Sequence, residues 1–331
     1  MAQNNHQTAR PTIVWLAVAF FLLILLAVFI GRYPGPFLMS PGRLLNDALA
    51  QRLVFNLRLP RILTAVLLGM SLSAAGAVLQ MIFGNPLVEP GFLGVSQGAA
   101  FGAAFSIITF SGMTWLVQPV AALFAFVGLG LSYLVARHVR FGGWLLRLIL
   151  AGIAVSALFS AGLGILKYVA DPLSQLPEIT FWMLGGLWTL NWPKFLSIVP
   201  AVLLGLSVIW LMRWRLNLLS LNDQTAFSLG TAPARERLIL LTMAVLVTAA
   251  VVSVAGIVSW VGLIIPHIVR RVFGADAREL IPASMLIGAM FTLVCDTLAR
   301  TIFPGEVPLG ILTSLIGASV FLYLMHAGKR P

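Results

Sequence analysis

Charged residues are scarce in this sequence. Only 9% of its 331 residues are Asp, Glu, Lys or Arg, and 60% are hydrophobic, whereas roughly a quarter of an ordinary soluble domain is charged. A soluble globule of this composition could not cover its surface with polar groups. The net charge of +11 therefore does not indicate a nucleic-acid-binding face, because that function needs basic groups gathered on a water-exposed surface.

Lysine, cysteine and histidine are scarce as well, and each shortage excludes a kind of chemistry. The three lysines, at 167, 194 and 329, are followed by Tyr, Phe and Arg, so none ends the Gly-Lys-Ser/Thr turn of a phosphate-binding loop. The only cysteine, Cys295, has no disulfide partner, and the four histidines lack the spacing of a metal site. The sequence therefore predicts no catalytic residue, no metal site and no ATPase site of its own.

Long charge-free runs are the main feature that the sequence does contain. Because roughly 20 apolar residues cross the hydrocarbon core of a bilayer, such runs are typical of membrane helices. The run 90–136 is long enough for two crossings and has a Ser-Gly turn at 111–112, and Gly256 divides the run 238–269 into a longer and a shorter helix. We predict an all-α polytopic membrane protein with about ten transmembrane helices. The spans are expected near 12–31, 61–82, 93–110, 114–136, 145–168, 193–213, 236–256, 258–272, 280–301 and 308–327.

The basic residues indicate the orientation of these spans. With a cytoplasmic N-terminus, thirteen Lys and Arg residues lie on the cytoplasmic side and eight on the other side. This excess agrees with the positive-inside rule, so both termini are predicted to be cytoplasmic. The first span has no small-residue cleavage site after it and is expected to be retained rather than removed as a signal peptide.

Carboxylates are almost absent from the spans. Asp296 lies well inside one of them, and Arg300 follows four residues later on the same helical face, an order that favours an ion pair. The residues favour a structural pair here over a site for a coupling ion. The prolines and glycines of the segment 85–94 indicate a turn at the cytoplasmic boundary; contact of Glu89 with the ATPase or with a neighbouring helix is the other interpretation, and no gating role is assigned to it. We therefore expect a partner protein to supply energy, with a proton-coupled secondary transporter as the alternative from another class.

Short motifs occur in one order from about residue 12 to the C-terminus. The first half contains NLRLPR (56–61), GAVLQ (76–80), NPLVEPGFLG (85–94) and SQGA (96–99). The second half contains FWMLGG (181–186), LNDQTAFSLG (221–230), VGLIIPH (261–267), DTLAR (296–300) and PLGI (308–311). Together they resemble the FecCD-type permeases, the membrane subunits of type II importers for iron-siderophores, haem and cobalamin.

The resemblance implies a fold like that of the cobalamin-importer permease and a set of partners. These are a second permease subunit in a homodimer or a paralogous heterodimer, two cytoplasmic ATPases that bind ATP and Mg, and a periplasmic or extracellular substrate-binding protein. The chain would bind no cofactor and no nucleic acid, and would lie in the bacterial inner (cytoplasmic) membrane. The expected organisation is one transmembrane permease domain over 1–331, with a weak internal repeat at 61–170 and 236–327 and a cytoplasmic coupling segment at 214–235.

The middle of that cytoplasmic segment has the pattern of a short capped helix. Asn222 or Asp223 can accept backbone N–H bonds at its start, and Gly230 suits the position after its end. Ala226, Phe227 and Leu229 would form a small apolar face between them. On residues alone a surface loop on the headgroups is the other interpretation; the resemblance implies a coupling helix that sits in a groove of the ATPase.

Arginines at the opposite membrane face have two interpretations. Arg58 and Arg61 are three residues apart around Pro60, which is tolerated in the first turn of a helix. From the residues alone they are interfacial anchors that reach lipid phosphates. The resemblance implies that Arg58, Arg61 and Arg300 dock acidic groups on the substrate-binding protein.

Small residues on the fifth and tenth spans are candidates for a pathway wall, because the resemblance places these two spans along the pathway. They are Ser156, Ser160, Gly164, Ser314 and Ser319. Close helix packing also explains such residues. An aromatic set near the outer face, Phe181 with Trp182, Trp188 and Trp192, favours an interfacial belt over contact with a flat ligand. The expected cargo is an iron-siderophore, then haem, then cobalamin, with oxyanions such as molybdate lower.

Overall fold

The computed structural model of the protein describes residues 5–32, 38–303 and 305–327, with side chains described from residue 14 onward. Within these ranges the chain folds into helices joined by turns, and the only β-type pairing is one isolated bridge between Ile30 and Leu38. The predicted all-helical fold class is therefore confirmed.

Ten helices match the ten expected segments one for one. They are α1 (Asn5–Phe29), α4 (Leu59–Phe83), α5 (Val95–Thr109), α6 (Val117–His138), α7 (Trp144–Val169), α9 (Trp192–Leu219), α11 (Pro233–Ala255), α12 (Val261–Phe273), α13 (Ala277–Ala299) and α14 (Leu309–Ala327). Shorter helices that we did not expect lie between them: α2 (Pro41–Asn46), α3 (Ala48–Leu53) and α8 (Gln175–Leu184). The short helix expected in the segment 222–230 is α10 (Asp223–Ser228), and single turns are η1 (Val54–Arg58), η2 (Pro90–Leu93) and η3 (Thr114–Leu116).

Seven helical stretches of the described chain are long and apolar enough to cross a membrane. One of them, Ala48–Phe83, joins α3, η1 and α4 into a continuous rod. Helices α5 and α12 are shorter than a full crossing, and the described side chains of α1 cover only Val14–Phe29. The count of ten crossings and the cytoplasmic termini therefore stay predictions. Lys329 and Arg330, which entered the charge count, lie outside the described residues.

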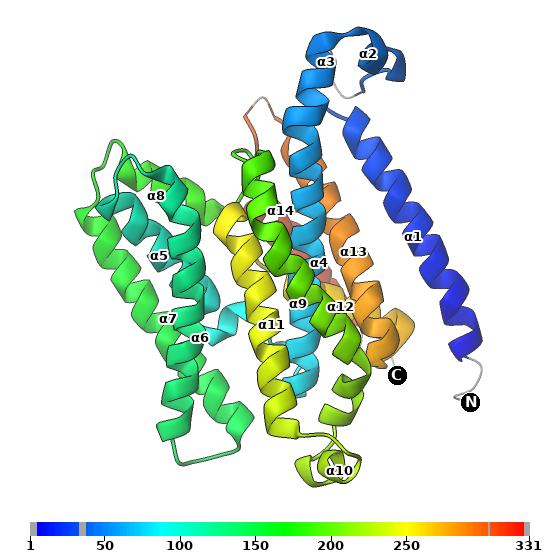
Figure 1. Cartoon of the computed structure of the whole chain (residues 1–331), viewed down its shortest axis with the longest axis vertical. Coiled ribbons are helices and arrows are strands. Elements are labelled where there is room, and N and C mark those ends of the chain that lie inside the picture. The colour runs from blue at the N-terminus through cyan, green and yellow to red at the C-terminus, as the bar shows by residue number, and fades with distance from the viewer. Residues whose placement is uncertain (1–4, 33–37, 304, 328–331) are drawn as a thin grey trace.

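Helix α4 is the central element of the molecule. It packs against α9, α11, α12 and α13. In the most apolar stretch of the rod Ala48–Phe83, 83% of the residues are buried. Helices α5, α6 and α7 pack on one another as a second group with α8, to the left in Figure 1, and α6 and α5 contact α11. Few residues in the apolar stretches of α6, α7, α9 and α14 are buried, only 22 to 28% of them, which suits lipid or a partner chain rather than water.

Glycine permits the closest helix crossing in the core. A methyl group at Gly76 of α4 would collide with the backbone carbonyl of Gly262 at the start of α12. Small residues of this kind let membrane helices approach until their backbones touch, which increases van der Waals contact. The crossing packs α4 directly on α12, two helices that are far apart in the sequence, and so joins them in one core.

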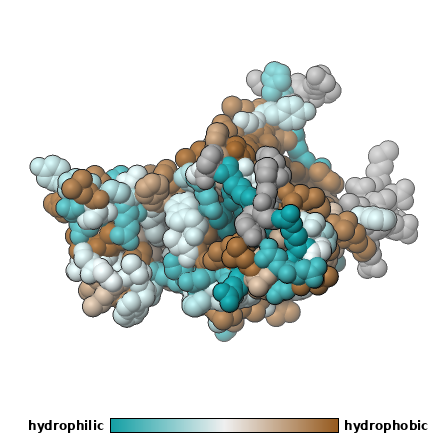
Figure 2. Space-filling view, turned by 90° about the horizontal axis from the view of Figure 1, so that it is seen from above, coloured by the Kyte–Doolittle hydropathy of each residue, from teal (hydrophilic) through white to brown (hydrophobic). Residues whose placement is uncertain are grey.

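The two ends of the molecule differ in composition. The end that carries α2 and α3 is called the α3 end, and the opposite end, which carries α10, is called the α10 end (Figure 1). Viewed from above, onto the α3 end, hydrophilic residues gather over the middle, with apolar residues toward the rim (Figure 2). The arginines at 58, 61 and 300 belong to the α3 end, and the basic residues around α10 belong to the other.

Candidate functional site

A charge cluster lies at the α3 end, where α4 meets the end of α13. Arg61 Nε donates to Asp296 Oδ1 at 2.8 Å, and its Nη1 donates to both oxygens of Glu306 at 2.8 Å. The Asp296 side chain is fully buried, whereas that of Glu306 is 38% exposed. Arg300 lies farther from Asp296, with 3.9 Å between Nε and Oδ2. One guanidinium therefore bridges a buried carboxylate and a surface carboxylate.

The other two arginines of this group hold the end of α1. Arg58 Nη1 donates to the carbonyl of Val28 at 3.0 Å, and Arg300 Nη2 donates to that of Ala27 at 2.5 Å. The last carbonyls of a helix have no partner within the helix, so these bonds satisfy groups that would otherwise need water. Arg58, Arg61 and Arg300 thus lie at the same end of the molecule, and their hydrogen bonds stabilise the packing of α1, α4 and α13.

The sequence identified only the weaker partner of Asp296. The predicted pair with Arg300 exists at 3.9 Å, but the shorter contact comes from Arg61, 235 residues earlier in the chain. Helical spacing shows only neighbours on the same helix. Glu306 was also missed, although an acidic residue shortly after Arg300 in a charge-poor loop was a signal that could have indicated it.

Helix α10 lies at the tip of the α10 end (Figure 1), and the exposed side chains of Phe227 and of the C-cap residue Leu229 are called the apolar knob. Asn222 caps the helix, accepting from the backbone N–H of Thr225 at 2.8 Å. Phe227 is 72% exposed and Leu229 is 54% exposed. The predicted cap is confirmed, and Gly230 has the left-handed backbone that suits a helix end. Ala226, which we expected on the apolar face, is instead fully buried, so Phe227 and Leu229 form that face without it.

One ion pair holds α10 against the spans, and a second joins the two spans beside it, α9 and α11. Arg237 at the start of α11 contacts Asp223 at 2.6 Å and also donates to the carbonyl of Leu219, the last residue of α9. Arg215 contacts Glu236 at 2.6 Å. Because Arg237 is almost buried, α10 is tied directly to the ends of α9 and α11. A force applied to α10 would therefore pass into these two helices.

The candidate pathway residues lie on two separate helices. Ser156, Ser160 and Gly164 follow one another at four-residue spacing on α7, and the last two are exposed. On α14, Ser319 is exposed, with its hydroxyl bonded to the carbonyl of Leu315 at 2.8 Å, whereas Ser314 is half-buried. Helix α7 packs on α5 and α6, whereas α14 packs on α12, α13 and α8. One copy of the chain therefore does not enclose a channel between these two stripes.

The segment 256–260, between α11 and α12, contacts both α8 and the turn after α4. Gly256 has a φ of 70°, and a methyl group there would collide with the carbonyl of Trp182 in α8. The backbone N–H of Trp260 hydrogen-bonds to the carboxyl group of Glu89 in the turn after α4. Burial raises the pKa of Glu89 above its ordinary value, and this hydrogen bond acts in the opposite direction. Glu89 thus contacts the start of the neighbouring helix α12, one of the two contacts that the sequence left open for it.

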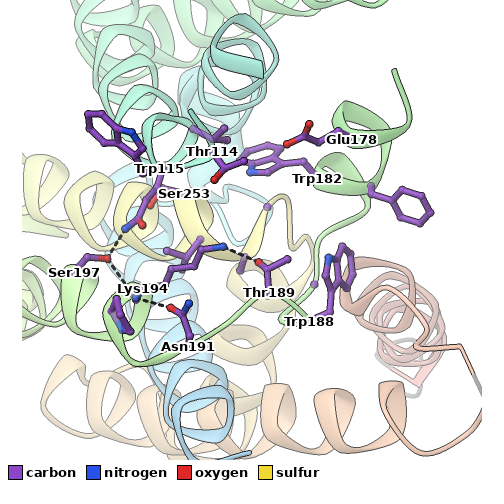
Figure 3. A pocket seen from close by; sticks show the side chains of 18 residues that line it. Thr114, Trp115, Glu178, Trp182, Trp188, Thr189, Asn191, Lys194, Ser197 and Ser253 are labelled. Atoms are coloured by element: carbon purple, nitrogen blue, oxygen red, sulfur yellow. Dashed lines mark hydrogen bonds between the residues drawn. The ribbon is translucent and has the colours of Figure 1, made fainter. Parts of the chain in front are cut away.

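The aromatic set near the α3 end does not form a single surface. Trp192 donates its indole N–H to the carbonyl of Phe55 at 2.8 Å, and so fastens α9 to η1. Phe181 and Trp188 contact each other edge to face, with 6.4 Å between ring centroids. Trp182 and Trp188 line a cavity (Figure 3). Among the described residues, no three His, Cys, Asp or Glu side chains lie close enough to hold a metal ion.

Comparison with known proteins decides the family. A model of the FecCD transport family matches residues 18–327. The chain belongs to the FecCD transport family. It is 40% identical to the molybdate import system permease protein MolB of Haemophilus influenzae, over 93% of this chain and 94% of that protein. It is also 38% identical to the hemin transport system permease protein HmuU of Yersinia pestis, over 94% and 95% of the two chains.

A solved structure of a metal-chelate type ABC transporter in an inward-facing conformation has the same fold. The TM-score is 0.88 at 38% identity, over 96% of this chain and 99% of that chain. This FecCD-family chain is therefore an ABC transporter permease subunit and a multi-pass protein of the bacterial inner membrane. Permeases of this kind have no ATPase site of their own, and ATP and Mg are used by partner ATPases.

Proposed function

We propose that this FecCD permease passes an iron chelate from a binding protein at the α3 end to the cytoplasm at the α10 end, driven by partner ATPases. Iron-siderophore is the first cargo proposed and haem the next. The observation that carries the proposal is the exposed pair Phe227 and Leu229 on a helix tied by Arg237 to two spans. Exposed apolar side chains surrounded by basic residues are typical of a site that binds another protein, because burying them in a groove of that protein removes them from water.

The orientation of this proposal comes from the charge distribution. Placing the α10 end in the cytoplasm puts thirteen basic residues there and eight on the outer side. Nucleotide-driven movement of the ATPases would then press on α10 and pass through Asp223 and Arg237 into α9 and α11. Phe227, Leu229 and the cap residue Asn222 are the proposed coupling residues, with Asp223 and Gly230 shaping the helix and Ala226 anchoring it inside.

The arginine cluster at the α3 end is the proposed docking site for the binding protein. Arg61 already holds the surface carboxylate of Glu306, so an acidic group on the binding protein would exchange with Glu306 rather than meet an empty guanidinium. Bidentate bonds between guanidinium and carboxylate carry orientation as well as attraction. Docking through Arg58, Arg61 and Arg300 would therefore align the binding protein with the permease.

Charge reversal tests this docking site. Arg58→Glu combined with Arg61→Glu should weaken complex formation, and reversing the partner carboxylates should restore part of it. Because Arg61 also pairs with the buried Asp296, folded protein is first checked by size-exclusion chromatography. Unchanged binding at low salt by correctly folded Arg58→Glu protein would refute the docking role of Arg58.

The translocation pathway is proposed to form between two copies of the chain or between the chain and a paralogue. Ser160, Gly164 and Ser319 are exposed in the single chain, and two stripes of small polar residues on separate helices can line a wet path once a second subunit faces them. Iron needs no protein ligands along such a path if the chelate is carried whole.

Reconstitution in proteoliposomes tests the whole proposal. The permease is combined with its ATPase and binding protein, and uptake of a radiolabelled ferric siderophore is measured with ATP inside the vesicles or without it. Uptake that requires ATP, ATPase and binding protein supports the importer. Equal uptake by the permease alone under a proton gradient would instead indicate the secondary transporter.

An oxyanion is a candidate cargo from a different chemical class, because the relative that is 40% identical is named as a molybdate import permease. The same vesicles distinguish the cargoes when unlabelled haem, cobalamin and molybdate compete with the ferric siderophore. Competition by molybdate alone, with no uptake of any iron chelate, would overturn the iron proposal while leaving the permease assignment in place.

A further inference from the structure

A cavity of about 780 Å³ opens near the α3 end and is lined from α6, α8, α9 and α11, not from α7 or α14, which carry the proposed pathway residues. Its walls are the first turns of α6 and α9 and the helix α8, and the last turn of α11 lies beneath it (Figure 3). This volume is within the range of small-molecule sites, which is about 300 to 1,000 Å³. None of the functions proposed above uses this cavity.

The cavity contains two opposite charges that do not pair with each other. Lys194 comes from α9, and Glu178 comes from α8 on another side of the cavity (Figure 3). Within the described part of the chain neither has an ion-pair partner, and Lys194 Nζ donates only to the hydroxyl of Thr189, at 3.0 Å. A lysine ammonium has three donors, so it can bind a further acceptor. Separated charges of opposite sign complement a zwitterion.

The cavity lies at the level where lipid headgroups are expected. It is built from the ends of α6, α9 and α11, three of the candidate spans. Trp115 at its rim is 71% exposed and Trp188 is 39% exposed. Tryptophan is enriched at membrane interfaces because the indole ring is apolar and its N–H is polar. A ligand bound here would have its polar part at the membrane surface.

An apolar surface leads from the cavity toward the middle of the membrane. Gln118 and Ser197 join α6 to α9 by a hydrogen bond of 2.6 Å within the lining of the cavity. Farther along α9, Pro200 and Leu204 continue the helical face of Pro193, and both are exposed. They lie within about 17 Å of Pro193 along the helix, since an α-helix rises 1.5 Å per residue, so this apolar face fits acyl chains attached to a headgroup in the cavity.

We propose that this cavity binds the headgroup of a zwitterionic diacyl phospholipid. The phosphate accepts from Lys194, the ammonium group contacts Glu178, and the acyl chains lie along the Pro200 and Leu204 face of α9. The continuous apolar surface of a candidate span favours a membrane lipid over a water-soluble solute. The proposal does not depend on the identity of the transported cargo.

Native mass spectrometry of the detergent-solubilised permease with its ATPase tests the proposal. The complex is titrated with phosphatidylethanolamine and, separately, with phosphatidylglycerol, which has the same phosphate but no ammonium group. Wild type should bind phosphatidylethanolamine about tenfold more tightly, since one charge-assisted contact corresponds to roughly that factor. Glu178→Gln should remove this preference, and Lys194→Met should weaken the binding of both lipids.

Lys167→Met is the matched control, because Lys167 is also a lysine near the α3 end of a span, on α7, but does not line the cavity. It should leave both affinities unchanged. Glu178 is exposed, so Glu178→Gln should fold normally even if a change at Lys194 does not. Equal affinity of wild type for the two lipids would overturn the proposal. So would displacement of the bound lipid by a soluble ferric siderophore, which would assign the cavity to the cargo.

Discussion

At the scale of single residues, Asp296 has the largest structural role in the arginine cluster. Its carboxylate is fully buried and accepts from Arg61, while Arg300 lies beside it with only 8% of its side chain exposed. Removing one partner of a buried ion pair leaves an uncompensated charge in a medium of low dielectric constant. Glu306 contacts the same arginine but is partly exposed, so water can replace it.

We therefore expect Asp296→Ala to destabilise the protein by about 3 to 5 kcal/mol, the range for breaking a buried pair. Glu306→Gln should cost less than about 1 kcal/mol, as for surface pairs. Thermal unfolding of the purified permease in detergent, followed by intrinsic fluorescence, measures both. A similar Tm for the two variants would show that Asp296 is not the dominant partner of Arg61.

At the scale of elements, α10 is the clearest candidate for contact with another protein. The backbone of α10 is held in place by its cap, by the buried Ala226 and by the ion pair with Arg237. Phe227 is not needed for this and can contact another protein. Phe227 is largely exposed and contributes little to the core. A change there can therefore separate coupling from folding.

We expect Phe227→Asp to insert and fold like wild type but to uncouple ATP hydrolysis from uptake, lowering uptake at least about tenfold, because a charge replaces an apolar contact at a protein interface. Uptake and ATPase activity are measured in the same vesicles. Leu211→Asn, also an exposed apolar position but on the side of α9, is the control and should transport normally. Full uptake by the Phe227 variant would end the assignment of α10 as the coupling helix.

The crossing of α4 and α12 depends on Gly76 in a different way. Any side chain there would meet the backbone of Gly262, which cannot move without displacing a helix. Gly76→Leu should therefore abolish stable folding, and Gly76→Ala should destabilise by about 1 to 3 kcal/mol, the range for overpacked cores. Gly130→Ala on α6, where a methyl group meets no atom within 4 Å, should be tolerated. The amount of monodisperse protein after detergent extraction compares the three variants.

At the scale of the whole molecule, α14 indicates where a second subunit would lie. Only 22% of the residues in its apolar stretch are buried. Ile311, Leu315 and Ser319 follow one another on an exposed face at four-residue spacing. The one cysteine, Cys295, is buried, so an introduced cysteine is the only accessible thiol. This background suits cross-linking without further changes.

We expect Leu315→Cys to form a disulfide-linked dimer under mild oxidation if two copies face each other across α14. Leu211→Cys, which is exposed on α9, should stay monomeric in the same gel. The physical reason is distance, because a disulfide needs Cα atoms within about 7 Å of each other. Cross-linking of the Leu211 variant but not of the Leu315 variant would place the subunit interface on α9.

The sequence alone determined the helical class, the approximate extent of ten helices, and the divisions near Gly112 and Gly256. These properties depend on local composition, because charge-free length and helix-breaking residues act within a short stretch of chain. The cap by Asn222 was predictable for the same reason, since its partner is Thr225, only three residues later. The positions of helix ends were less predictable. Helix α9 continues through Arg213 and Arg215 to Leu219, beyond its expected end at 213, because arginine favours a helix and does not end one.

Only the tertiary structure decided the contacts between distant segments. It brought Arg61 to Asp296, buried Ala226 beneath α10, joined Glu89 to Trp260 and placed Lys194 and Glu178 around one cavity. None of these follows from helical spacing, because each depends on how separate helices pack and on which face of each is covered. The composition of the sequence thus determined that the chain enters a membrane, and the packing of α4 with its neighbours determined which of its few charges pair internally and which stay available for partners.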